Sequence, residues 1–406
     1  MFQGVTMQIT EDIKYIGVND HEIDLFEGQY VVPQGMAYNS YLVKDEKILV
    51  FDTVDRRFGD EWLANIKKEI QDAKIDYLVV QHMEPDHSAN IARFAQTYPE
   101  AKIVASNQAF TMMKQFFGQE FADKCIGPVE RRVVIKEGDT LTTGRHTFAF
   151  VAAPMVHWPE VMVTYDTTDK ILFSADGFGK FGANDVVDPE GWDCEARRYY
   201  IGIVGKYGVN TQMLLKKAAN LEIKKICPLH GPVLSTEEEI AHAIKQYNTW
   251  SSYAVETPGL LIAYTSVYGH TKEAALKLKE LVLARGCPKV AVADLARDDQ
   301  PEAVEDAFRY GALVLATTTY NMDIFPWMRH FIDHLTERNY QSRFVGFIEN
   351  GSWAPNAMKV MKGMLEKSKN LTFAQNNVTI RGALDPVSTQ QLTALAGELA
   401  NLWKKA

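Results

Sequence analysis

The sequence predicts two domains of different architecture: an α+β domain followed by an α/β domain built on a doubly wound parallel sheet. Three observations support this prediction. The second part of the chain alternates apolar runs with helical patterns, short β-type runs dominate the first part, and Pro258-Gly259 separates the two rhythms. The length of 406 residues agrees with two or three domains, because one domain takes roughly 150 residues.

The first domain is expected over residues 1–252 and should contain more strands than helices. Its apolar, β-type runs are short, and they lie at 41–43, 48–51, 77–80, 103–105, 147–151, 162–165 and 171–174. Helical patterns lie at 60–72, 88–97, 107–117 and 193–219. Because strands predominate and helices are interspersed, layered α+β packing is expected.

A linker is expected over residues 250–259, after a helical pattern at 236–247 and up to the Pro-Gly break. The second domain is expected over residues 259–406. Its apolar runs lie at 260–264, 290–292, 312–316, 344–348 and 378–380, and its helical patterns at 271–285, 302–308, 325–337, 355–368 and 388–403. Regular alternation of this kind predicts a parallel sheet covered by helices on both faces.

Composition excludes several functional classes. The formal net charge of −9 argues against nucleic acid as a partner. No apolar run approaches the roughly 18 residues that span a bilayer, and the N-terminus does not resemble a secretory signal, so a cytoplasmic protein without a membrane partner is expected. The cysteines are too widely spaced for a disulfide framework or a CxxC metal site; they are Cys125, Cys194, Cys227 and Cys287.

Potential metal ligands are concentrated directly after the apolar run at 77–80. His82, Glu84, Asp86 and His87 lie within six residues there. Pro85 disfavours a continuing helix, so a loop is expected. In an extended loop His82, Glu84 and Asp86 would share one direction, and His87 would point elsewhere, which suits a second metal ion.

Three more candidate ligands, His157, Asp176 and His230, each follow an apolar, strand-like run. Strand ends of one sheet converge, so these side chains could surround the same cleft. A lone histidine such as His146, His242 or His334 is more often a surface or satisfied core residue. A packed cluster of imidazoles and carboxylates, in contrast, would cost several kcal/mol to desolvate without a metal ion.

The ligand types restrict the choice of metal without deciding it. Imidazoles and carboxylates without cysteine suit iron, zinc or manganese. The set is too large for one open site, so two metal ions sharing Asp176 is the economical arrangement. Three anionic side chains among the ligands favour a centre that reaches a trivalent state, whereas zinc has no redox chemistry.

The second domain contains three loops that suit a flavin mononucleotide (FMN). After the first strand, hydroxyls, a glycine and a helix start can bind a phosphate; this loop comprises Thr265, Ser266, Val267, Tyr268, Gly269, His270 and Thr271. Neither GxGxxG nor GxxxxGK[ST] is present, which disfavours a dinucleotide or a P-loop site.

The other two loops follow the third and fourth strands, where ligands of such sheets bind. They comprise Thr318, Thr319, Tyr320 and Asn321, and Asn350, Gly351, Ser352 and Trp353. Tyr320 and Trp353 could flank a planar isoalloxazine ring. In the alternative interpretation, Trp353 packs at a helix start and the threonine run is a plain turn.

The pattern His82-x-Glu84-x-Asp86-His87, with His157, Asp176 and His230, resembles the metal signature of the metallo-β-lactamase-like fold. In the zinc hydrolases of that fold, the position of Glu84 is usually histidine. Glutamate here, followed by a flavodoxin-like domain, resembles the flavodiiron proteins (A-type flavoproteins) over essentially the whole chain. The resemblance implies a metallo-β-lactamase-like αββα sandwich followed by a flavodoxin-like parallel sheet.

The resemblance also implies the composition of the site. One iron would bind His82, Glu84 and His157, the other would bind Asp86, His87 and His230, and Asp176 would bridge the two. Trp158 and Tyr200 would lie near the site as further catalytic residues. The chain ends at Ala406 without a rubredoxin or flavin-reductase extension, so the minimal two-domain class is expected.

The activity implied by the resemblance is reduction of O2 to water, of NO to N2O, or of both, with electrons relayed through FMN. The donor would be a rubredoxin, or a reduced deazaflavin cofactor as in some relatives. A head-to-tail homodimer, or a tetramer, would bring the FMN of one subunit to the irons of its partner. The alternatives are a binuclear zinc hydrolase fused to a flavodoxin, and an electron shuttle with a vestigial metal site.

Overall fold

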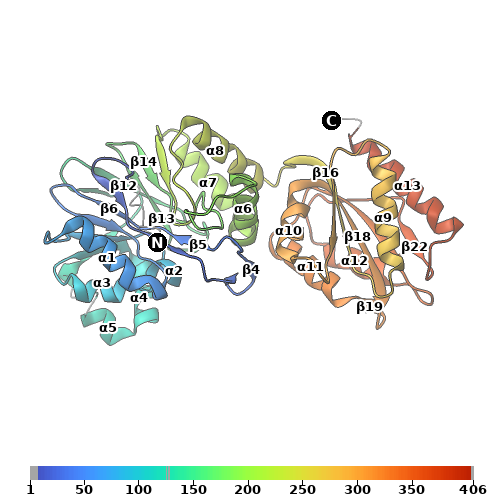
Figure 1. The fold of residues 1–406 in the computed structure, drawn as a ribbon, viewed down its shortest axis with the longest axis horizontal. Helices are drawn as coiled ribbons and strands as arrows, with labels where there is room; N and C mark the ends of the chain where they lie inside the picture. Colours follow the sequence, from blue (N-terminus) through green and yellow to red (C-terminus); the bar gives the residue numbers. More distant parts are fainter. Residues whose placement is uncertain (1–7, 125, 127–128, 404–406) are drawn as a thin grey trace. The chain divides into compact units, whose positions relative to one another are not determined.

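The computed structural model describes residues 8–124, 126 and 129–403, and it divides the chain into two compact units (Figure 1). The first unit contains the chain up to Tyr200 together with Val209–Tyr247, and the second contains Ile201–Gly208 and the chain from Asn248 onward. Each unit has its own sheets and core, and each is described by itself below. The boundaries 1–252 and 259–406 stay a prediction, and Cys125 lies outside the described residues.

The first unit is built around two sheets. In spatial order, the larger sheet consists of β1 (Ile13–Tyr15), β6 (Tyr41–Val43), β7 (Leu49–Phe51), β8 (Tyr77–Val80), β9 (Lys102–Ser106) and β10 (Arg132–Ile135). The smaller sheet consists of β11 (Thr140–Thr142), β12 (Thr147–Ala152), β13 (Met162–Asp166), β14 (Ile171–Phe173) and β15 (Lys225–Cys227). Two small ribbons pair β2 (Val18–Asp20) with β5 (Met36–Tyr38) and β3 (Leu25–Phe26) with β4 (Tyr30–Val31).

The apolar core of this unit lies between the two sheets. Phe51 of β7 stacks on Phe173 of β14 with ring centroids 4.0 Å apart, and both rings are fully buried. Phe148 of β12 meets Phe51 edge-on, at 5.4 Å. Aromatic contacts of this kind add to the hydrophobic gain of burial, so these rings fix how one sheet sits on the other.

Helices cover both outer faces of the two sheets, which gives the predicted αββα layers (Figure 1). One side carries α1 (Gly59–Ile70), α2 (Pro85–Ser88), α3 (Ile91–Thr97), α4 (Asn107–Phe117) and α5 (Gln119–Lys124). The other side carries α6 (Trp192–Tyr199), α7 (Gly208–Ala218) and α8 (Glu237–Ser251).

The structure corrects two expectations for the first part of the chain. The segment after Glu84 is not an extended loop, because Pro85 begins the short helix α2; the missing N–H of proline costs nothing at the first position of a helix. The helical pattern at 193–219 is not one helix, because a π-turn at Tyr200–Val204 and a 3₁₀ turn at Gly205–Tyr207 separate α6 from α7. The residues between α6 and α7 include Gly202 and Gly205, and glycine has a low helix propensity.

The second unit is built on a parallel sheet. Its strands lie in the spatial order β17 (Val290–Asp294), β16 (Thr257–Tyr264), β18 (Tyr310–Tyr320) and β20 (Phe344–Asn350). Two short strands, β21 (Thr372–Phe373) and β22 (Val378–Ile380), both pair with β20. This is the doubly wound order of the flavodoxin-like fold, as predicted. On one face α9 (His270–Leu283) packs with α13 (Pro386–Trp403), and on the other α11 (Pro326–Glu337) packs with both α10 (Gln300–Arg309) and α12 (Ala357–Leu365).

Two segments of the second unit differ from the sequence-based expectation. The run 317–320, expected as a loop, belongs to β18 and forms a hairpin with β19 (Asp323–Ile324) through a turn with positive φ at Asn321 and Met322. Pro258 and Gly259, expected as a break, lie inside β16, at an irregularity of its pairing with β18. Proline is accepted near a strand start or a bulge. In the part of the chain that the structure describes, no helix has the length and apolar composition to cross a membrane.

Candidate functional site

The first group of candidate ligands gathers at strand ends of both sheets in the first unit. His82 and Glu84 follow β8, His157 lies between β12 and β13, and Asp176 follows β14. The Nε2 atom of His157 lies 2.9 Å from Oε2 of Glu84 and 3.1 Å from Oδ2 of Asp176, and Nε2 of His82 lies 3.2 Å from the same Glu84 oxygen. Nitrogen and oxygen donors from distant parts of the chain thus converge on one point.

A second group lies beside the first. Asp86 and His87 belong to α2, and His230 follows β15. The Nε2 atoms of His87 and His230 are 2.9 Å apart, and Oδ2 of Asp86 lies 3.3 Å and 3.2 Å from them. Neighbouring side chains point about 100° apart in a helix, instead of in opposite directions as in an extended segment, so Asp86 and His87 of α2 can reach the same point.

Asp176 lies between the two groups and presents one oxygen to each. Its Oδ2 faces His82 and His157, at 3.5 Å and 3.1 Å, and its Oδ1 lies 3.2 Å from Nε2 of His87. Asp176 is buried. A carboxylate with this placement can bridge two metal ions.

The donor geometry fits a metal ion in each group. Two ligands that are each about 2.1 Å from one ion, and at right angles, lie about 3.0 Å apart, which matches the separations above. Within the described part of the chain, both carboxylate oxygens of Asp86 and Oδ1 of Asp176 are buried without a hydrogen bond. Buried charges without partners are costly, and a cation would satisfy them. Burial by itself would lower the pKa of His82. The carboxylates of Asp176, Glu160 and Glu84 together have the larger opposite effect, so the pKa of His82 lies well above its ordinary value.

Two carboxylates that the sequence analysis did not select hold this arrangement in place. Asp52 accepts hydrogen bonds from the backbone N–H of Gln81 and of His82, and burial raises its pKa to about 6. Glu160 Oε1 accepts from Nδ1 of His82, at 2.9 Å, and from the backbone N–H of Met83. Neither residue lies in a recognisable motif, so the fold alone reveals them.

The two histidines with hydrogen-bonded Nδ1 atoms have a defined tautomer. His82 donates from Nδ1 to Glu160, and His230 donates from Nδ1 to the carbonyl oxygen of Ala37, at 2.8 Å. The Nε2 atom of each neutral ring is then an unprotonated acceptor that points into the cluster. Partners of this kind commonly orient imidazole ligands of metals.

Of the two aromatic residues predicted near the metal ligands, Trp158 contacts a ligand and Tyr200 packs elsewhere. The Trp158 ring meets the His82 ring edge-on, at 5.3 Å between centroids. Tyr200 packs against Tyr247 and donates a hydrogen bond to Thr211, whereas the neighbouring Tyr199 lies 5.6 Å from the His230 ring. Burial, and then the charge of Asp176, raise the pKa of Tyr199 well above its ordinary value. The buried Tyr199 hydroxyl has no hydrogen-bond partner among the residues that the structure describes.

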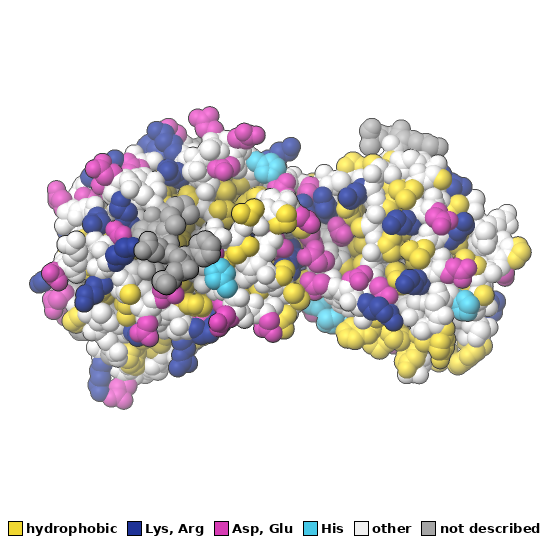
Figure 2. All heavy atoms as spheres, in the orientation of Figure 1, with side chains coloured by type: hydrophobic (Ala, Val, Ile, Leu, Met, Phe, Trp, Pro, Cys, Tyr) yellow, Lys and Arg dark blue, Asp and Glu magenta, His cyan; other side chains and the backbone are white. Residues whose placement is uncertain are grey.

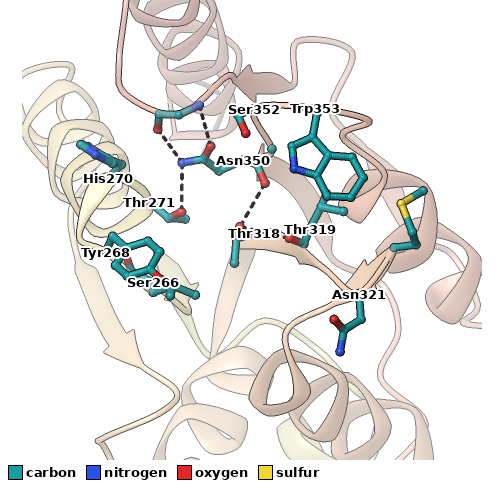
Figure 3. A pocket seen from close by; sticks show the side chains of 14 residues that line it. Ser266, Tyr268, His270, Thr271, Thr318, Thr319, Asn321, Asn350, Ser352 and Trp353 are labelled. Carbon is teal, nitrogen blue, oxygen red and sulfur yellow. Dashed lines mark hydrogen bonds between the residues drawn. The ribbon is translucent and has the colours of Figure 1, made fainter.

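A pocket of about 240 Å³ lies at the carboxyl ends of β16, β18 and β20 in the second unit (Figure 3). Side-chain hydroxyls and amides predominate among its polar groups. The lining residues are Ser266, Val267, Tyr268, His270, Thr271, Thr318, Thr319, Asn321, Met322, Asn350, Gly351, Ser352, Trp353 and Gly382. The helix α9 begins at His270, and Gly269 before it has the positive φ of +99°. A helix start beside a hydroxyl-rich pocket suits a phosphate group.

Asn350 connects the three loops of this pocket. Its side-chain amide donates to the carbonyl oxygen of Gly382, at 2.8 Å, and to the hydroxyl of Thr271, at 3.4 Å, while Oδ1 accepts from the Gly382 N–H (Figure 3). The Thr318 hydroxyl donates to the Asn350 carbonyl oxygen. Hydrogen bonds between the loops therefore hold the pocket together.

Three of the residues selected from the sequence do not line the pocket. Thr265 is buried beneath it and shares a hydrogen bond with the Thr317 hydroxyl, at 2.6 Å. Gly269 supplies the turn before α9, and Tyr320 packs against Phe325, with ring centroids 5.3 Å apart. Tyr268 and Trp353, on opposite sides of the pocket in Figure 3, are the aromatic residues at its rim. Met322 and Gly382 line it without having been selected.

Comparisons with known proteins agree with this architecture. Residues 36–231 match the family described as ODP family beta lactamase. The chain is 28% identical to the rubredoxin-oxygen oxidoreductase of Megalodesulfovibrio gigas, with 98% of both proteins covered. The solved rubredoxin oxygen:oxidoreductase of Desulfovibrio gigas superposes with a TM-score of 0.91 at 26% identity, and covers 98% of this chain and 99% of its own.

The chain is similar in fold to the flavodiiron proteins. The nitric oxide reductase of Moorella thermoacetica is 27% identical over 92% of each protein. The flavodiiron protein of Giardia intestinalis, at 23% identity and a TM-score of 0.91, shares the fold over the whole of this chain and 99% of its own. These similarities extend across both units, so the order of a β-lactamase-like unit and a flavodoxin-like unit is that of flavodiiron proteins.

Proposed function

We propose that this chain is a flavodiiron protein, an oxidoreductase that reduces O2 to water, NO to N2O, or both, at a di-iron centre supplied with electrons through FMN. The observation that carries the proposal is the position of Asp176, which offers one oxygen to each of two groups of histidine and carboxylate donors. The similarity to proteins named nitric oxide reductase and rubredoxin-oxygen oxidoreductase supports the same activity.

The two donor groups indicate which residues would hold the metal ions. His82, Glu84 and His157 would hold one iron, Asp86, His87 and His230 would hold the other, and Asp176 would be shared. The set contains only nitrogen and oxygen donors, which suits iron. When bound, the iron pair and FMN would together supply the redox chemistry. The residues that line the pocket of the second unit would hold the FMN.

Residues around the donor groups would orient them and exclude water. Glu160 and the carbonyl oxygen of Ala37 hold the rings of His82 and His230 with Nε2 toward the centre. Aromatic rings surround His230: Phe26, Tyr38 and Tyr199 lie within 5.5–5.8 Å. The Tyr199 hydroxyl, which lacks a partner, is available to donate a hydrogen bond to a small oxygen-containing substrate.

Electrons would arrive from another molecule, for which a rubredoxin is the first candidate because a relative is named rubredoxin-oxygen oxidoreductase. A reduced deazaflavin is the second candidate. We further propose a head-to-tail homodimer, alone or paired into a tetramer, in which the FMN of one subunit serves the irons of its partner, and a cytoplasmic location.

The decisive experiment combines composition with turnover. The purified protein should contain two irons and one FMN per chain, and the anaerobically reduced protein should consume O2, NO or both in parallel assays. The relative rates would assign the preferred gas. Asp176→Ala should release iron while leaving the flavin spectrum unchanged. Zinc without iron, or no consumption of either gas, would contradict the proposal.

The alternative function, a binuclear zinc hydrolase fused to a flavodoxin, is not favoured. The relatives and the solved structures named above are reductases, oxidoreductases and flavodiiron proteins. Glu84 also stands where the zinc hydrolases of this fold usually have histidine.

A further inference from the structure

The helix α11 of the second unit carries a pair of histidines whose ring nitrogens face each other. His330 and His334 are four residues apart and therefore lie on one face of the helix. Their Nε2 atoms are 3.1 Å apart, close to the 2.9 Å between the Nε2 atoms of His87 and His230. His330 is exposed and His334 is half-buried, so an ion in solution can reach the pair.

Gln300 determines which nitrogen of His330 carries the proton. The Gln300 amide nitrogen donates to the carbonyl oxygens of Leu295 and Trp327, at 3.0 Å and 3.3 Å, which leaves its Oε1 facing Nδ1 of His330 at 2.9 Å. Because Oε1 only accepts, Nδ1 of His330 is the donor. The Nε2 atom of the neutral ring is therefore an unprotonated acceptor.

Arg338 determines the tautomer of His334 in the same way. The guanidinium of Arg338 donates to Nδ1 of His334 at 2.9 Å, and a guanidinium cannot accept. Nε2 of His334 therefore carries the proton and donates to Nε2 of His330. Without a metal ion, hydrogen bonds thus run in one direction from Arg338 through His334 and His330 to Gln300.

We propose that His330 and His334 form a second metal site, for a divalent transition ion such as Zn²⁺ that prefers imidazole ligands, and that Arg338 competes with the ion. Histidines four apart on a helix are an established way to hold zinc. The ion would bind both Nε2 atoms, and the proton of His334 would move from Nε2 to Nδ1. Arg338 would lose its bond to Nδ1 and keep its bond to the His334 carbonyl oxygen.

The surroundings of His334 favour the neutral ring that a metal ion needs. Burial, and then Arg338 and His330, lower the pKa of His334 to about 4. Protons therefore do not compete for this ring at neutral pH. The carbonyl oxygen of Gln300 on Nδ1 of His330 is the kind of partner that orients an imidazole ligand.

Equilibrium dialysis of the full-length protein, loaded with its own metal ions and flavin, against Zn²⁺ tests the proposal. The wild-type chain should bind one more Zn²⁺ than His330→Gln or His334→Gln, and each variant should lose about 10-fold or more in affinity for that ion. Zinc that replaces ions in the first unit would be equal in all three proteins, so the difference isolates the pair. His242→Gln, which removes an exposed histidine elsewhere, is the matched control and should bind as the wild type does.

Two variants of Arg338 test the competition. Arg338→Gln should bind Zn²⁺ about 10-fold more tightly than the wild type, because a glutamine oxygen can accept from Nδ1 of His334. Arg338→Lys, which keeps a donor and a charge, should show no gain. Equal zinc binding by the wild type and both histidine variants would overturn the site, and an equal response of the two arginine variants would overturn the competition. Flavin content and far-UV circular dichroism verify that each variant is folded.

Discussion

At the scale of single residues, the arrangement of the donor groups depends on carboxylates that would not themselves hold a metal ion. Glu160 joins the ring of His82 to the backbone of Met83, and Asp52 holds the backbone at Gln81 and His82. Both carboxylates are buried, so their hydrogen bonds are formed away from water. The position of His82 and Glu84 is therefore set by the surrounding fold as much as by the ligands.

Glu160→Gln should weaken metal binding without unfolding the chain. The amide oxygen can still accept one hydrogen bond, but the negative charge beside His82 is lost, and such changes cost 10–100-fold, roughly, in metal affinity. The affinity is measured by competition with a chelator of known strength. Glu137→Gln, at an exposed ion pair with Lys217, is the control and should retain wild-type affinity. Equal affinities in all three proteins would contradict this role of Glu160.

At the scale of elements, close approaches between strands decide where side chains are tolerated. A Cβ atom on Gly259 of β16 would lie 2.7 Å from the Tyr310 ring and 2.9 Å from the Lys289 carbonyl oxygen. Gly363 of α12, in contrast, has no atom within 4 Å of such a Cβ. A larger residue is therefore not tolerated at Gly259 without a backbone shift, whereas Gly363 has room for one.

Gly259→Ala should destabilise the protein by about 1–3 kcal/mol, because the strand has no room for a methyl group. Gly363→Ala is the matched control and should stabilise by about 1 kcal/mol, since alanine favours an exposed helix over glycine. Urea unfolding followed by circular dichroism measures both. A neutral Gly259→Ala would mean that β16 shifts freely at this position.

His334 of α11 should make the free energy of unfolding depend on pH. The pKa of His334 is about 4 in the folded chain, because burial, Arg338 and His330 disfavour its charged form, whereas an unfolded histidine has a pKa of about 6.5. Below about pH 6.5 the unfolded chain binds a proton that the folded chain does not bind, so stability is lost as the pH falls toward about 4.

His334→Gln should flatten this part of the stability curve. Urea midpoints of the wild type and the variant, measured at several pH values between about 4 and 7, give the comparison. The wild-type midpoint should fall more steeply than that of the variant as the pH drops from about 6.5 toward about 4. Parallel curves would show that His334 does not contribute to the acid dependence.

Some parts of the site could be predicted from the sequence and others could not. Asp176 and His230 could be selected as candidate ligands because each directly follows a regular apolar run. The helical turn at Pro85 was not, since proline both ends and begins helices. Glu160 and Tyr199 gave no signal, because a single glutamate or tyrosine becomes distinctive only when the fold brings it to a histidine ring.

At the scale of the whole molecule, the two units have separate cores, and the predicted metal ions and the flavin would each belong to one unit. The rings of Phe51 and Phe173 lie within the first, and the core of the second is formed by residues such as Leu260, Val314 and Ile348. A ligand that binds only the folded state stabilises the unit that holds it. Metal ions should therefore affect one unit selectively.

Removal of the metal ions with a chelator should lower one unfolding transition and leave the other in place. A ligand present at about 1,000 times its dissociation constant adds about 4 kcal/mol to the free energy of unfolding. A change of this size shifts the midpoint temperature of unfolding of a domain by several degrees or more. Calorimetry should show the lowered transition, and release of flavin fluorescence should report the unchanged one. A common shift of both signals would mean that the units unfold together.

The turn between β18 and β19 places Met322 at φ +63°, a left-handed backbone that a side chain with a Cβ adopts at a cost of about 1–2 kcal/mol. Met322 nevertheless borders the pocket of the second unit. The chain thus accepts local strain at a residue whose flexible, polarisable side chain lines the pocket. Glycine at this position would relieve the strain and stabilise the hairpin, but it would also remove a side chain that restricts which molecules fit the pocket.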